Sequence, residues 1–194
     1  MTTVPKRRLT PEEYLAQERK AEYKSEYYDG ETFAMSGASR AHNLIAGNVI
    51  REAGNQLRDR DCEVYSSDMR VKVSRTGLYT YPDVVMVCGE PRFEDAEVDT
   101  LLNPTVLFEV LSESTEGHDR GKKAEHYRRI PSLREYILIA QDECHVERFS
   151  RQPDHGWLLW ETEDIEAVLD LPSISCQIKL SDIYAKVQLA KRAP

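Results

Sequence analysis

The segments "YPDVVMV" (residues 81–87) and "VLFEVLS" (residues 106–112) decide the fold of this chain. Each is an apolar, β-branched run of the kind that forms a strand buried on both faces of a sheet. Each run nevertheless contains one carboxylate, Asp83 or Glu109, and an unpaired charge in such a place costs several kcal/mol. The two acids therefore need a partner of opposite charge.

The flanking residues predict where the two acids lie. Pro82 cannot donate a hydrogen bond to a sheet, so Asp83 is expected near a strand end. The Glu109 strand ends at Leu111, just before the polar segment 112–119. If the strands are neighbours, both carboxylates meet at one edge of the sheet and repel unless a cation lies between them. Carboxylate oxygens suit Mg²⁺ or Mn²⁺, so the sequence predicts a site for one of these ions.

Length and composition narrow the class of protein. The chain has 194 residues and no linker-like stretch, so we expect one domain spanning 1–194. No apolar run is long enough to span a membrane and no signal-peptide core follows the N-terminus, which predicts a soluble, cytoplasmic protein. The four cysteines form no C-x-x-C pair and are expected to be reduced, buried thiols.

The charge argues against a surface that binds nucleic acid everywhere. The net charge is −8, from 26 basic and 34 acidic residues, so any site for nucleic acid must be local. Basic residues concentrate near both ends and in the segment 120–129. The terminal groups are expected to be solvated surface, whereas Arg120, Lys122 and Arg128 are candidates for contacts to phosphate.

The chain alternates between helical and strand patterns without an internal repeat. Helix signals are a Thr10 cap followed by Pro11, an apolar stripe of 3.6-residue period over 39–57, and the segment 118–130. Strand signals cover a hairpin around Asp29-Gly30, half-exposed strands over 62–77, the two acid-bearing runs, the buried run 135–140, and an antiparallel pair at 145–150 and 157–163. This order predicts an α/β (α+β) domain with helices over one mixed sheet and a helix crossing over between residues 111 and 135.

The predicted helix after the second acid offers a basic group to the same edge. Asp119, Lys123 and Tyr127 are spaced i, i+4 and i+8, so they share one helix face, whereas Lys122 lies off that face. Taken alone, Asp119 and Lys123 would be an ordinary surface ion pair. Beside two strand carboxylates, Lys123 is better interpreted as a group that reaches a metal-bound water or a phosphate.

These motifs resemble a known family. "YPD" (81–83) with "EVL" (109–111) is similar to the PD-(D/E)XK nuclease superfamily, which has a restriction-endonuclease-like fold. The stretch "EVLSESTEGHDRGKKAEHY" (109–127) resembles more closely the Uma-two family of bacterial restriction-endonuclease-like proteins. "YYDGE" (27–31) and "SGASRAHNLIAGNV" (36–49) also fit that family, so the resemblance covers nearly the whole chain.

The resemblance implies roles for individual residues. Asp83 and Glu109 would bind the metal together with the backbone carbonyl of Val110. The superfamily lysine is replaced by Leu111, and Lys123 matches the position to which it has moved in this family. Further residues would assist the metal or the substrate: Glu26 as an additional acid, and His42, Asp119, Arg120, Lys122 and Tyr127 on the substrate side.

The resemblance therefore implies a Mg²⁺- or Mn²⁺-dependent endonuclease that hydrolyses phosphodiester bonds in DNA, with a homodimer expected by analogy. Two alternatives remain open at this point. One is a nuclease-like module that binds without cutting, and the other is a metal-dependent phosphoesterase that acts on a small nucleotide. The acidic composition fits both alternatives.

Overall fold

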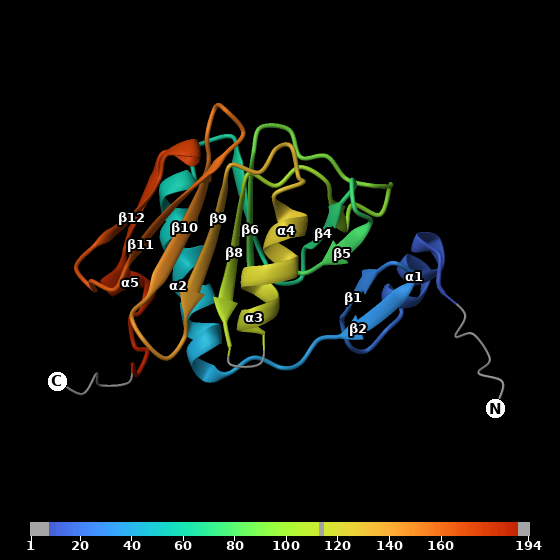
Figure 1. The fold of residues 1–194 in the computed structure, drawn as a ribbon, viewed down its shortest axis with the longest axis horizontal. Helices are drawn as coiled ribbons and strands as arrows, with labels where there is room; N and C mark the ends of the chain where they lie inside the picture. The colour runs from blue at the N-terminus through green and yellow to red at the C-terminus, as the bar shows by residue number, and fades with distance from the viewer. Residues whose placement is uncertain (1–7, 113–114, 190–194) are drawn as a thin grey trace.

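The computed structural model describes residues 8–112 and 115–189, so Lys6, Arg7, Lys191 and Arg192 of the predicted basic ends lie outside it. Its centre is a six-stranded mixed sheet that contains both acid-bearing runs (Figure 1). From one edge to the other its strands are β11 (Trp157–Thr162), β10 (Val146–Arg151), β9 (Glu135–Ala140), β8 (Val106–Leu111), β6 (Val84–Cys88) and β3 (Cys62–Ser66).

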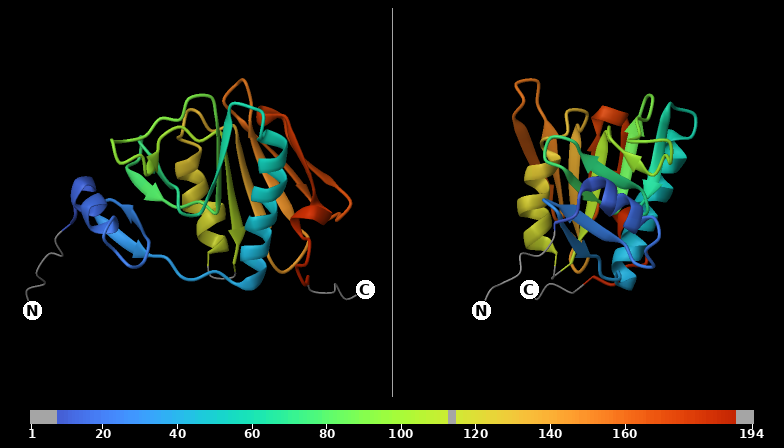
Figure 2. Two further views of the ribbon diagram at one scale, coloured as in Figure 1. Left: turned by 180° about the vertical axis from the view of Figure 1, so that it is seen from behind. Right: turned by 90° about the vertical axis from the view of Figure 1, so that its right-hand side faces the viewer.

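Helices cover both faces of this sheet (Figure 2). The predicted long helix is α2 (Arg40–Leu57), whose buried stripe packs on Val84, Met86 and Phe108. On the other face a single run of helix is formed by α3 (Glu116–His118), the π-helical turn η1 (Asp119–Lys123) and α4 (Ala124–Tyr127). This run connects β8 to β9, which are parallel, so the predicted crossover helix is confirmed.

The expectation of one sheet is wrong, because a second sheet of five strands lies beside the first. Its order is β2 (Glu31–Ala34), β1 (Ser25–Tyr28), β5 (Leu78–Thr80), β4 (Arg70–Val73) and β7 (Thr100–Leu101). The predicted half-exposed segment 62–77 divides between the two sheets, because a turn at residues 66–69 ends β3 and lets β4 pair with β5 and β7. In its new place β4 is largely buried.

The N-terminal elements follow their sequence signals. Helix α1 (Pro11–Glu18) begins at Thr10, whose hydroxyl accepts a hydrogen bond from the Glu13 amide. Asp29 and Gly30 both have positive φ, as a two-residue hairpin turn requires, and they join β1 to β2. Tyr14 of α1 stacks on Tyr27 of β1, so the helix covers one face of the hairpin (Figure 1).

The C-terminal part contains the predicted antiparallel pair β10–β11 and a hairpin that we did not predict. That hairpin comprises β12 (Val168–Leu171), the 3₁₀ turn η2 (Pro172–Ile174) and β13 (Cys176–Lys179), followed by α5 (Leu180–Ile183). Its alternating buried residues join the core beneath α2, and among them are Leu169, Leu171 and Ile178. The alternation is visible in the sequence and could have identified these strands.

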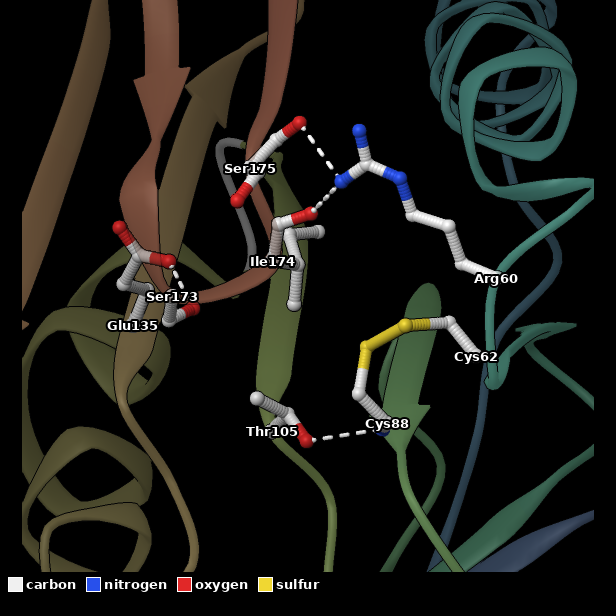
Figure 3. The surroundings of a disulfide bond; sticks show 8 residues. All are labelled: Arg60, Cys62, Cys88, Thr105, Glu135, Ser173, Ile174 and Ser175. Carbon is white, nitrogen blue, oxygen red and sulfur yellow. Dashed lines mark hydrogen bonds between the residues drawn. A yellow bond between two sulfur atoms is a disulfide. The ribbon is translucent and has the colours of Figure 1, made fainter.

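The prediction that all four cysteines are reduced is also wrong. Cys62 and Cys88 form a disulfide across the β3–β6 pair, where they are directly opposite with Cα atoms 4.0 Å apart (Figure 3). They are 26 positions apart in sequence, so only the strand pairing reveals them as partners. Disulfides persist mainly in oxidising compartments, so this one does not favour the expected cytoplasmic location, which stays a prediction. No helix within the described residues is long and apolar enough to cross a membrane.

Candidate active site

The two strand acids meet where the neighbouring inner strands β6 and β8 of the large sheet end. Strands β6 and β8 are antiparallel with Val84 opposite Phe108, and one further step of this register places Asp83 opposite Glu109. The Val110 amide donates a hydrogen bond to Asp83 Oδ2 at 2.7 Å. The N–H and C=O of a strand residue point to the same side, so the Val110 carbonyl also points toward the Asp83 side of β8.

Helix α2, which covers the sheet face opposite to α3 and α4, brings His42 to the same strand ends. The helix begins at Ser39, whose hydroxyl accepts a hydrogen bond from the His42 amide, so His42 lies in the first turn. His42 Nε2 lies 3.0 Å from Asp83 Oδ2. His42 therefore holds the Asp83 carboxylate in place.

Lys123 is at the centre of the acidic group. Its buried Nζ lies 3.0 Å from Glu109 Oε1, 3.1 Å from Glu26 Oε1 and 3.4 Å from Asp119 Oδ1. Burial by itself lowers the pKa of Lys123, but these carboxylates outweigh burial and hold the pKa well above its ordinary value. The Lys123 side chain is therefore an ammonium ion that lies beside the ends of β6 and β8.

The other residues of the predicted helix face converge on the same place. Tyr127 is fully buried, and its hydroxyl donates a hydrogen bond to Glu109 Oε1 at 2.7 Å. Asp119 is buried beside Lys123, and its Oδ1 has no hydrogen-bond partner within the described part of the chain. The intervening turn is a π-helix, a rare local widening that often marks functional sites and that the sequence did not predict.

The acids of this group outnumber its bases. Burial raises the pKa of Glu109 well above its ordinary value, with Asp83 and Asp119 adding to the rise and Lys123 opposing it. Burial likewise raises the pKa of Asp119. Such a surplus of carboxylates, together with a backbone carbonyl and a buried Asp119 oxygen that makes an ion pair but no hydrogen bond within the described residues, fits a hard divalent cation, which prefers oxygen ligands.

A groove gives access to these groups. A cavity of about 760 Å³ is lined by Asp83, Glu109, Lys123 and His42, and by residues of the segment 34–39 that leads from the hairpin to α2. Glu26 of β1 also lines it, so the smaller sheet contributes a wall and one acid to the site. A substrate can therefore approach the carboxylates from solvent.

Two of the predicted substrate-binding residues lie elsewhere, and a third, Tyr127, is fully buried against Glu109 and does not line the groove. Arg120 pairs with Glu116 at 2.8 Å and with Glu147 of β10, so its charge is already balanced and it does not line the groove. Lys122 is exposed and lines a neighbouring cavity, as expected for a residue off the Lys123 face. The structure thus brings together the following predicted residues: Asp83, Glu109, Lys123, Glu26, Asp119, His42 and Tyr127.

Sequence analysis missed a second group of potential metal ligands. The ligand atoms of His145, Glu147 and Glu161 lie within 4.8 Å of one another. Glu147 and Glu161 are directly opposite on β10 and β11, and His145 is two residues before Glu147 on the same side of the strand. The His-x-Glu spacing is the only sequence signal for it. The Arg120 guanidinium pairs with Glu147, so a positively charged side chain already balances part of the negative charge of this group.

The fold matches that of a solved structure. A crystal structure described as a "putative nuclease belonging to DUF820" from Anabaena variabilis superposes with a TM-score of 0.73 over 93% of this chain and 99% of that one, at 17% sequence identity. At this identity the likeness concerns the fold, and it confirms the expected mixed α+β architecture.

The sequence comparisons identify the family. Residues 11–181 match the family model "Uma2: Putative restriction endonuclease", so the chain belongs to the Uma2 (Uma-two) family. Among its relatives is the uncharacterized protein sll1609 of Synechocystis, 40% identical over 79% of this chain and 86% of the relative. The uncharacterized protein slr1290 of the same organism is 34% identical over 94% of each chain. The chain is thus nuclease-like, and restriction endonuclease-like families generally use divalent metals.

Proposed function

We propose that this chain is a Mg²⁺- or Mn²⁺-dependent endonuclease that hydrolyses phosphodiester bonds in DNA, with residues 1–194 acting as one domain. One observation supports this most strongly. The buried ammonium group of Lys123 lies within 3.4 Å of three carboxylates, next to a fourth carboxylate from the adjoining strand. An ion pair that only stabilised the fold would need one acid, whereas this group has a surplus of acids that open onto a groove.

Each residue of the site has a proposed role in the reaction. Asp83, Glu109 and the Val110 carbonyl would hold the metal, which supplies a water of lowered pKa and polarises the phosphate. Lys123 would neutralise the negative charge that develops on the phosphate in the transition state. Tyr127 orients Glu109 through its hydrogen bond, and Glu26 and Asp119 orient the ammonium. His42, in contact with Asp83, is suited to accept or return a proton.

The test is an assay of purified protein on supercoiled plasmid and on single-stranded DNA, with Mg²⁺, with Mn²⁺ and with EDTA. We expect cleavage that requires the metal and is lost in Asp83→Asn, a substitution that preserves the size of the side chain. Cleavage that persists in EDTA or in Asp83→Asn would contradict the proposal.

Two added measurements, metal binding by calorimetry and hydrolysis of a small nucleotide, separate the alternatives. Metal binding without cleavage of any DNA would favour a binding module. Hydrolysis of a small nucleotide with no action on DNA would favour the phosphoesterase. We also propose a homodimer by analogy with other nuclease-like folds, and sedimentation measures the oligomeric state directly.

A further inference from the structure

A second cavity, of about 950 Å³, adjoins the groove of the candidate active site. Glu26, Phe33, Thr115 and His118 line both cavities, so the two spaces adjoin along the hairpin and the start of the crossover helix. Pockets of about this size hold small organic ligands, and one that adjoins a reacting centre is placed to hold a neighbouring part of the substrate.

One wall of this cavity is the outer face of the hairpin. Side chains alternate along a strand, so Tyr27 points toward α1 whereas Glu26 and Tyr28 point the other way. Phe33 is directly opposite Glu26 and therefore shares its face. Tyr28 is 40% exposed and Phe33 is 50% exposed. The strand that sends Glu26 to Lys123 thus presents two aromatic rings to solvent beside the candidate active site.

The opposite wall is helical and basic. Lys122, Glu125, His126 and Arg129 recur at the spacing of one helix face, and all four line the cavity. Glu125 pairs with Arg129 at 4.0 Å, whereas Lys122 has no ion-pair partner within the described residues.

The ring of His126 extends from the helical wall to the hairpin wall. It contacts the Tyr28 ring edge to face at 4.7 Å between centroids, and its Nδ1 lies 2.8 Å from Thr76 Oγ1. Burial lowers the pKa of His126, so the ring is neutral at pH 7. Arg75, in the turn between β4 and β5, adds an exposed positive charge at the rim.

Exposed aromatic rings beside basic groups form the kind of surface that binds single-stranded nucleic acid, because unstacked bases pack on the rings while cations bind the phosphates. A duplex, in contrast, needs positive charge spread over a wider surface, and the net charge of the chain is −8. We propose that this cavity binds an unstacked base of single-stranded DNA next to the phosphate to be cut, so that the enzyme prefers single-stranded or locally unpaired DNA. This inference rests on the proposed nuclease function.

The experiment measures binding without cleavage. A short labelled oligonucleotide, alone or annealed to its complement, is titrated with the protein in EDTA at low salt and followed by fluorescence anisotropy. We expect tighter binding of the single strand. Phe33→Leu and Tyr28→Ala should each weaken it by about tenfold, the effect typical of one lost base–aromatic stack. Phe33→Tyr and Tyr28→Phe keep a ring and should bind like the parent.

The substitutions at Phe33 distinguish stacking from a general apolar contact. If Phe33→Leu binds the single strand as tightly as the parent does, the rings do not stack on bases and the inference is wrong. Equal or tighter binding of the duplex would also overturn it. The binding assay contains EDTA and does not depend on cleavage. If only the nuclease proposal is wrong, the protein will not cleave DNA, but its binding of the single strand will still depend on the two rings.

Discussion

Two networks of acidic and basic side chains in this molecule differ in their balance of charge. Around Lys123, a single ammonium group faces the carboxylates of Glu109, Glu26 and Asp119, and Asp83 lies beside them. In the second network, the carboxylates of Asp95 and Asp99 face two guanidinium groups, those of Arg19 and Arg70. The first network is at the groove and the second ties α1 to the loop before β7.

The pKa values shift in opposite directions in the two networks. The hydrogen bonds from Arg19 hold the pKa of Asp99 far below its ordinary value, whereas burial among other acids raises the pKa of Glu109. A balanced network satisfies its own charges and needs nothing more from solvent. An acid-rich network gains free energy from an added cation, and this difference is why we assign the metal to the first network rather than to the second.

The largest expected effect comes from removing the ammonium group of the acid-rich network. Lys123→Met preserves the aliphatic stem, and we expect it to reduce DNA cleavage by about a hundredfold or more, as for loss of a group that stabilises transition-state charge. Binding of Mn²⁺ should be retained or become tighter, because the ammonium no longer competes for the carboxylates. Cleavage rates and calorimetry measure the two quantities separately.

Two matched substitutions are controls for this prediction. Lys122→Met removes an exposed cation of the neighbouring cavity, so it should weaken DNA binding but leave the cleavage rate at saturating DNA close to the parental rate. Arg19→Met removes a cation from the balanced network and should lower stability without affecting cleavage. If Lys122→Met is the inactive variant, the assignment of Lys123 is wrong.

An effect of comparable size, measured directly as binding, concerns metal affinity. Asp83→Asn and Glu109→Gln each remove a charged ligand oxygen, so Mn²⁺ binding should weaken by more than the roughly 10- to 100-fold typical of lost supporting contacts. Asp99→Asn should bind Mn²⁺ like the parent, because its carboxylate is already paired with Arg19 and Arg70.

The cluster of His145, Glu147 and Glu161 requires its own control, because its ligand atoms also lie close together. His145→Ala should leave the Mn²⁺ affinity unchanged if the acid-rich network is the metal site. Loss of Mn²⁺ binding in His145→Ala, with no loss in Asp83→Asn, would move the metal to β10 and the edge strand β11 and would contradict its assignment to the acid-rich network.

The acid-rich network could largely be predicted from sequence, because its signals are local. Two apolar runs located Asp83 and Glu109, and the helical period put Lys123, Asp119 and Tyr127 on one face. What could not be predicted depends on pairing between distant segments. Only the family resemblance indicated Glu26, whose position follows from the β1–β5 pair of a separate sheet, and the pairing of Arg120 with Glu147 depends on the distant strand β10.

The balanced network was missed for the same reason. Arg19 lies 80 positions from Asp99, and Arg70 lies on a strand that sequence analysis placed in the wrong sheet. The disulfide between Cys62 and Cys88 likewise depends on which strands become neighbours. Periodicity and caps identify elements and their faces, but they do not specify which distant elements pair.

The smallest expected effect tests the balanced network through pH. Because the pKa of Asp99 is lowered on folding, its carboxylate stabilises the folded state at pH values above the ordinary value near 3.8. That contribution is lost as the pH falls below this value toward the lowered pKa. Asp99→Asn should therefore be less stable than the parent at pH 7 by about 1 kcal/mol, a modest figure because solvent screens a carboxylate that is one-third exposed. Denaturant unfolding of both proteins between pH 7 and pH 2 should show the two curves converging at the acidic end, and a difference that stays constant over this range would mean that the ion pairs with Arg19 and Arg70 do not stabilise the fold.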